Sequence, residues 1–108
     1  MALVSRKYYK MVSALTEDDF SVVVPNGESW QVERWFGAAN GFRDCHVAII
    51  WDYEGANEEI LALSYGSVSY DINRIVIGNG VKKLAIILRN DSATSERLGA
   101  EFYYRILE

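Results

Sequence analysis

The sequence is poor in the residues on which disulfide, metal and nucleophilic chemistry depend. It contains one cysteine, one histidine and one proline among 108 residues. A single cysteine excludes an internal disulfide, and nothing indicates an oxidising compartment. Because His46 is the only imidazole, a histidine-based metal centre or a serine triad would lack partners. We therefore expect no metal site, and Cys45 is interpreted as a small buried hydrophobic residue.

Known catalytic and cofactor motifs are also missing. The chain has no GxSxG elbow, no phosphate-binding GxxxxGK[ST] loop, no dinucleotide glycine fingerprint and no CxxC pair. The segment DYEGANEE from Asp52 to Glu59 is rich in carboxylates, but its spacing does not fit an EF-hand, so we interpret it as a charged hairpin loop. The prediction is a protein that is not an enzyme and uses no cofactor.

Charge of one sign and long apolar runs are both scarce. The formal net charge is -4 and the pI is about 5.0, which disfavours a general electrostatic contact with nucleic acid. The only basic cluster, Arg6, Lys7 and Lys10, is interpreted as a solvated face. No apolar run is long enough for a membrane span and no signal-peptide pattern is present, so we expect neither nucleic acid nor membrane as a partner.

Apolar content is high and is divided into short segments. Hydrophobic residues make up 50% of the chain and aromatic residues 13%, which suits a single folded domain over residues 1–108. Runs rich in Val, Ile, Tyr, Phe and Trp alternate with turn residues, many with period-two patterning. The pattern predicts strands at 3–14, 19–24, 29–37, 45–52, 58–65, 69–78, 81–89 and 99–107.

About eight short strands predict an all-β fold: an antiparallel β-sandwich, jelly-roll-like. An immunoglobulin-like topology is the alternative, although the paired cysteines of antibody domains are absent. The segment IGNGV, Ile77 to Val81, places Gly and Asn between two apolar runs and predicts a tight hairpin. The predicted core comprises Val22, Val24, Trp30, Val32, Val47, Ile49, Leu61, Leu63, Leu84, Ile86, Leu88, Phe102 and Tyr104.

Two tryptophans in the segment NGESWQVERWFGAANG raise a question of register. Trp30 and Trp35 are five positions apart, and strand side chains alternate faces, so they should point in opposite directions. In one interpretation Trp35 stands on the outer face between Gln31 and Glu33. In the other, a β-bulge near Glu33 and Arg34 resets the register and turns both tryptophans inward.

Several strands carry apolar residues on the face that should be solvated. In CHVAIIW and VKKLAIILR, for example, Ala48, Ile50, Ala85 and Ile87 alternate with the expected core. A contiguous apolar patch needs a cover, and a second copy of the chain is the simplest one. We predict a homo-oligomer, a trimer or dimer, with an interface that includes Trp35, Ile50, Ala62, Ala85, Ile87 and Tyr103.

An outward Trp35 has a second explanation, which is glycan binding. An exposed aromatic ring can stack on a sugar while polar neighbours bind its hydroxyls. The alternative prediction is a carbohydrate-binding module whose ligand site includes Trp35, Gln31, Glu33, Arg34 and Asn40.

The segments FSVVVPNGESWQVERWFG, HVAIIWDYEG and GNGVKKLAIILRN resemble small β-sandwich proteins of tailed bacteriophages and prophages. The shared elements are a Pro-x-Gly-Glu-x-Trp turn, here Pro25, Gly27, Glu28 and Trp30, and a late Gly-x-Gly segment, Gly78 and Gly80, before an apolar strand that ends at Asn90. The resemblance spans about residues 19–90. It implies a structural, oligomeric component of a virion or tail, located in the virion or the host cytoplasm, with other virion proteins as further partners.

Overall fold

The computed structural model describes residues 2–39 and 44–107. The alternating segments of these residues pair as eight antiparallel strands. They are β1 (Val4–Val12), β2 (Thr16–Val23), β3 (Ser29–Ala38), β4 (Cys45–Trp51), β5 (Glu59–Ser64), β6 (Val68–Ile77), β7 (Lys83–Asn90) and β8 (Glu96–Leu107). Each predicted strand is present, and the largest differences are at the starts of β2 and β8, which lie three residues earlier than predicted.

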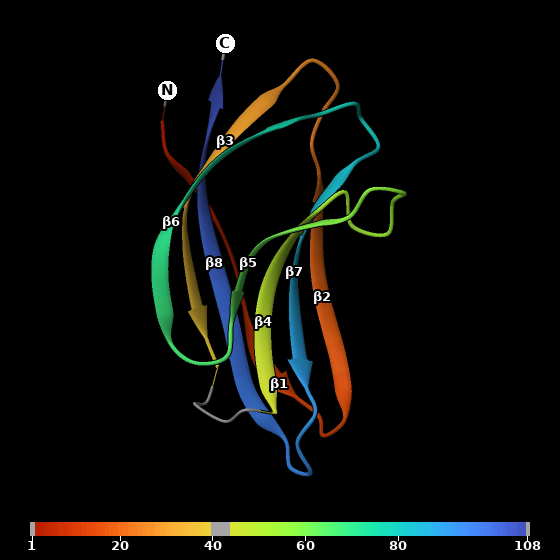
Figure 1. Ribbon diagram of the computed structural model, residues 1–108, viewed down its shortest axis with the longest axis vertical. Helices are drawn as coiled ribbons and strands as arrows, with labels where there is room; N and C mark the ends of the chain where they lie inside the picture. Colours follow the sequence, from red (N-terminus) through yellow and green to blue (C-terminus); the bar gives the residue numbers. More distant parts are fainter. Residues whose placement is uncertain (1, 40–43, 108) are drawn as a thin grey trace.

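The strands form two four-stranded sheets that face each other. The first sheet has the order β1-β8-β3-β6, and the second has the order β2-β7-β4-β5. Figure 1 shows the strands running along the long axis, with both ends of the chain at the same end of the molecule. All pairs are antiparallel, and the chain repeatedly crosses from one sheet to the other. The fold is therefore a jelly-roll β-sandwich, as the sequence predicts, and not an immunoglobulin-like one.

The predicted hairpin at IGNGV is wrong. The strand before it, β6, lies in the first sheet, and the strand after it, β7, lies in the second. The backbone φ of Gly80 is 82°, so the positive value expected at this turn is present. The Gly80 N–H donates to the Val24 carbonyl oxygen at 3.1 Å, which fixes this connection to the end of β2. The glycine-containing turn thus connects strands of two different sheets and not neighbouring strands of one sheet.

The core lies between the sheets, and most of its predicted members are buried. Trp30 stacks on Tyr104 with ring centroids 3.9 Å apart, and its indole N–H donates to Glu28 Oε1 at 2.8 Å. The Pro-x-Gly-Glu-x-Trp turn therefore has a local structural role. Val22 and Leu61 are only partly buried but pack against the core, whereas the prediction for Leu63 is wrong because this side chain is exposed.

Side chains close the gap between the sheets at the edge formed by β1 and β2. The Tyr8 hydroxyl donates to Asp18 Oδ1 at 2.8 Å, and the Lys10 ammonium donates to Asp18 Oδ2. These hydrogen bonds, from Lys10 first and Tyr8 second, lower the pKa of Asp18. The Tyr8 ring also stacks on Phe20, so a polar clamp and an aromatic pair join the two sheets here.

The opposite edge, formed by β5 and β6, is closed in a similar way. The Arg74 guanidinium makes two hydrogen bonds to the Glu59 carboxylate, one of them from Nη2 to Oε1 at 2.7 Å. The Leu63 backbone N–H donates to the Tyr70 hydroxyl at 3.1 Å. Because this amide lies on the edge strand of the second sheet, Tyr70 occupies a position where another strand would otherwise pair.

Candidate functional site

A β-bulge in β3 decides the direction of Trp35. The register of β3 shifts between Val32 and Arg34 against both of its neighbours, β8 and β6. Against β8, Glu33 is the extra residue, so Trp30, Val32 and Trp35 all face the core. Trp35 is 0% exposed, and its indole N–H donates to Ser64 Oγ at 2.9 Å. The outward orientation predicted for Trp35 is wrong, and the bulge interpretation is confirmed.

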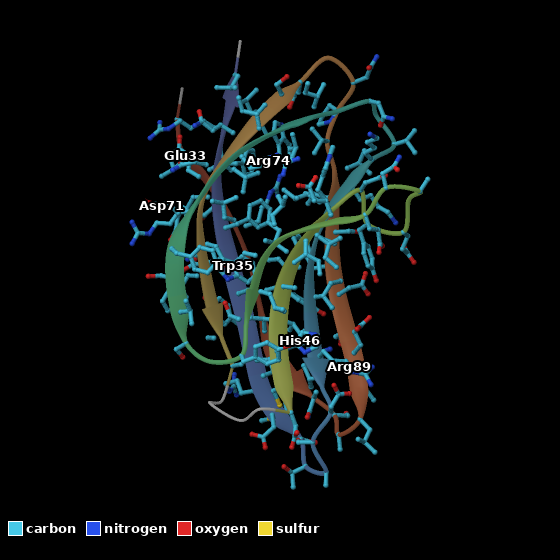
Figure 2. The ribbon with its side chains drawn as sticks, viewed as in Figure 1. Glu33, Trp35, His46, Asp71, Arg74 and Arg89 are labelled. Carbon is cyan, nitrogen blue, oxygen red and sulfur yellow. The ribbon has the colours of Figure 1, made fainter. Side chains whose placement is uncertain are left out.

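This correction removes Trp35 both from the predicted interface and from the predicted sugar site. Figure 2 shows Trp35 near the middle of the molecule, whereas Glu33 and Asp71 lie at its margin. The residue that follows, Phe36, takes the outward position and is 38% exposed. Trp35 therefore packs in the core. Any ligand contact by an aromatic ring on the outer face of this sheet must come from another residue.

A second bulge corrects the prediction for Ala62. The pairing of β4 with β5 shifts between Ile49 and Ile50, so that Ala62 lies opposite Ile49 and packs in the core. Ser64 faces inward as well, where its hydroxyl accepts the hydrogen bond from Trp35. The same shift turns Leu63 outward, which explains the error in the predicted core. Ala62 cannot belong to an interface on the outer face.

Other predicted interface residues do converge, on the outer face of the second sheet. Ile50 lies opposite Ala85, and Ala48 lies opposite Ile87, on the central strands β4 and β7. Ala48, Ala85 and Ile87 are buried but do not belong to the core cluster between the sheets. The neighbouring edge strand β5 extends this surface with exposed apolar side chains. We call the whole set the apolar face: Ala48, Ile50, Ile60, Leu63, Tyr65, Ala85 and Ile87.

Polar side chains border the apolar face. His46 lies opposite Arg89 on neighbouring strands, and Figure 2 shows the two together. The His46 ring is 5.6 Å from the Tyr65 ring, and Arg89 is hydrogen-bonded to Asp91 at 2.6 Å. An apolar centre with a charged rim is the usual anatomy of a protein–protein interface.

The outer face of the first sheet contains a groove of about 710 Å³. Three predicted site residues lie in it: Tyr103, which was predicted for the interface, and Glu33 and Arg34, which were predicted for the sugar site. Gln31 is on the same face but does not line the groove, and Asn40 lies outside the described residues. The remaining lining residues were not predicted from the sequence; they are Leu3, Phe36, Ser69, Asp71, Asn73 and Glu101.

One signal in the sequence points to these missed residues. If the bulge at Glu33 is accepted, the parity of β3 reverses after it, so Arg34 and Phe36 become the outward pair. The lining residues of β6 come from the strand that pairs with them: Asp71 is opposite Arg34, and Ser69 is opposite Phe36. The groove is thus built where two strands are irregular, since Asn73 also has a positive φ of 50°.

Ion pairs of different tightness surround the groove. Arg105 Nε donates to Glu33 Oε2 at 2.7 Å, a direct hydrogen bond. By contrast, Arg34 Nη1 is 3.9 Å from Asp71 Oδ1. Tyr9 lies on the same face, where burial and the nearby Glu101 carboxylate raise the pKa of its hydroxyl.

Metal-binding groups do not gather in the described part of the chain. No three His, Cys, Asp or Glu side chains of residues 2–39 and 44–107 are placed to hold a metal ion. Cys45 is fully buried, its thiol donates to Asn90 Oδ1 at 3.4 Å, and burial raises its pKa. A buried thiol of this kind is a poor nucleophile. Within the same residues no helix could cross a membrane.

Comparison with known proteins gives likeness at the level of structure. No protein-family model matches the chain, and no curated protein sequence matches it. A similar solved structure is the Drosophila NLP core, with a TM-score of 0.48 and 6% sequence identity over 95% of this chain and 99% of that one. That crystal structure concerns pentamer formation and histone binding by the Drosophila protein. At this identity no residue role is carried over to the present chain.

Proposed function

We propose that this protein is a non-enzymatic structural component that self-associates through the apolar face of its second sheet. The single observation that carries the proposal is the apolar character of the outer face of the second sheet, where Ile60, Leu63 and Tyr65 are exposed beside a centre that is already buried. Ile60, at 60% exposure, and Leu63 extend the surface from the buried centre to the edge strand. A solvated sheet face is normally polar, so this pattern favours a covered face.

The exposed edge of the second sheet is a less favourable contact than its face. Tyr70 already accepts the Leu63 amide, and the ion pair of Arg74 with Glu59 spans the same edge. Charged and hydrogen-bonded side chains at an edge oppose strand addition by another chain. Packing of one apolar face on another, as in sheet-on-sheet packing, leaves these contacts intact. A second copy of the same chain is therefore the occupant we propose.

The size of the face sets the expected strength of association. The three strands that carry it, about 4.8 Å apart and about six residues long, present a projected area of about 300 Å². Stable specific complexes bury about 800 Å² per partner. One face alone should therefore give a weak dimer, and a larger assembly would need a further contact. Such weak contacts become effective when other contacts hold the subunits at high local concentration.

An assembly of this kind agrees with the role that the sequence resemblance implies, a virion or tail-associated protein. We propose that role as the setting, with the homo-oligomer, a dimer or trimer, as its working form. Other virion proteins are the further partners. A jelly roll alone does not specify this role, because the fold serves many functions.

Sedimentation equilibrium tests the proposal on the native chain and two matched variants. Ile60→Asp places a charge on the apolar face. Ile75→Asp is the control, because Ile75 is 52% exposed on the outer face of the first sheet. At hundreds of micromolar we expect the native chain and Ile75→Asp to sediment above 12.2 kDa and Ile60→Asp to sediment as a monomer. A 12.2 kDa species for the native chain at every concentration would contradict the proposal.

A further inference from the structure

We propose that the groove on the first sheet binds a neutral saccharide, at a site separate from the apolar face. The groove is formed by the outer side chains of β8, β3 and β6. Its volume of about 710 Å³ falls within the range of small-molecule sites, roughly 300–1,000 Å³. This inference does not depend on self-association, which concerns the opposite sheet.

Aromatic rings supply the apolar part of the groove. Phe36, on β3, and Tyr103, on β8, both line it and face outward. A third ring, Tyr9, lies on the same sheet beside them. A Cβ atom at Gly99 would lie 1.8 Å from Tyr9 Cδ1, so the Tyr9 ring rests directly on the backbone of β8. Flat rings on a sheet surface offer the aliphatic face of a sugar ring a large contact area at little cost in entropy.

Loosely spaced ion pairs supply the polar part. Arg34 and Asp71 are separated by 3.9 Å, and Lys7 Nζ and Glu101 Oε2 by 3.8 Å. These distances exceed a direct hydrogen bond, so a ligand hydroxyl that approaches from the side can bind both members of a pair. A sugar hydroxyl suits this position, because it donates to the carboxylate and accepts from the cation at the same time.

The balance of charge indicates a neutral ligand. The three carboxylates of the groove, on Glu33, Asp71 and Glu101, each have a cationic partner: Arg105, Arg34 and Lys7, respectively. Arg105 and Lys7 do not line the groove themselves, so they neutralise its carboxylates from outside the lining, and no unpaired cation is left to attract a phosphate. Aromatic surface together with balanced donors and acceptors therefore favours a polyhydroxylated ring over an ion.

Titration of the ¹⁵N-labelled protein, followed by NMR, tests the proposal. The probes are cellobiose, maltose, lactose and N,N′-diacetylchitobiose, with tetramethylammonium chloride and sodium phosphate as ionic comparisons. We expect at least one disaccharide to shift amide signals in residues 33–36, 69–73 and 101–103 in a saturable manner. Absence of saturable shifts with every saccharide, or saturation by an ion alone, would overturn the proposal.

Variants then locate the site. Phe36→Ala and Tyr103→Ala should each weaken saccharide binding at least tenfold, because each removes a stacking surface. Tyr65→Ala is the matched control: Tyr65 is 54% exposed, but it lies just after β5 on the opposite sheet. Equal binding by all three variants would also overturn the proposal. Ile60→Asp should bind saccharide as the native chain does, so failure of self-association and failure of this site are distinguishable.

Discussion

The orientation of Trp35 and Phe36 can be tested by a pair of adjacent substitutions. Trp35 is fully buried and Phe36 is 38% exposed, because the bulge at Glu33 reverses the alternation of β3 before it reaches these two residues. Truncation of a buried aromatic side chain to alanine costs about 3–5 kcal/mol of unfolding free energy. Truncation of an exposed one costs about 0.5 kcal/mol or less. Trp35→Ala should therefore be destabilising and Phe36→Ala nearly neutral.

The hydrogen bond from Trp35 to Ser64 adds a second, separable contribution. Trp35→Phe keeps a ring but leaves the buried Ser64 hydroxyl without its donor. An unsatisfied buried hydroxyl costs about 1–3 kcal/mol. Removal of that hydroxyl in the double variant Trp35→Phe with Ser64→Ala should recover part of the loss. The pair should thus show a non-additive coupling, as contacting residues do.

Equilibrium urea unfolding followed by far-UV circular dichroism measures these four variants and the single variant Ser64→Ala, which completes the cycle, since this signal does not depend on tryptophan fluorescence. Domains of this size have unfolding free energies of about 5–15 kcal/mol, so a loss of about 4 kcal/mol moves the midpoint well outside error. The reasoning is refuted if Phe36→Ala destabilises the protein as much as Trp35→Ala. That result would mean that the strand keeps its simple alternation through Glu33.

Three further predictions concern the core and one sheet edge. Asn90 donates to the carbonyl oxygens of Val12 and Thr94 at 2.9 Å each, so Asn90→Ala should lower the unfolding free energy by about 2–3 kcal/mol in the same urea assay. Because its partners lower the pKa of Asp18 in the folded state, the stabilisation from this carboxylate is present above its unfolded pKa and is lost as pH falls through the lowered folded value. Asp18→Asn should accordingly flatten the acid side of the stability curve below about pH 4, and an unchanged slope would exclude this role. Cys45, buried and with a raised pKa, should react with a thiol reagent only on unfolding, and rapid modification of the native protein would show that it is accessible.

Local sequence signals were sufficient for the strands and the class of fold. In β4 and β7 the residues alternate between the two faces of the sheet, as side chains do in every strand. The sequence pattern therefore predicts these strands correctly. Positive-φ glycines at positions 27 and 80 also occur at the predicted turns. The partner of each strand is a different matter, because turn chemistry at Gly80 is compatible with both a hairpin and a crossover between sheets.

The outward residues were predictable only in part: Tyr103 faces outward but on the first sheet, whereas the errors at Trp35 and Ala62 share one cause. Ile50, Ala85 and Ile87 lie on β4 and β7, which pair with each other without a bulge. Their side chains therefore reach the face that alternation predicts. Trp35 and Ala62 each follow a bulge, where one extra residue reverses all later side chains. A bulge is defined by what lies opposite on the neighbouring strand, and that information is not local.

The sequence by itself therefore determined that this chain is a β-sandwich with more apolar side chains than one core can hold. Period-two alternation follows from backbone geometry alone. Only the tertiary structure decided which of those side chains face outward and which sheet presents them. Bulge positions, strand partners and the groove between Phe36 and Asp71 arise from pairing between segments distant in the chain. Those pairings depend on the burial of the whole core, because only its free energy selects one register over another.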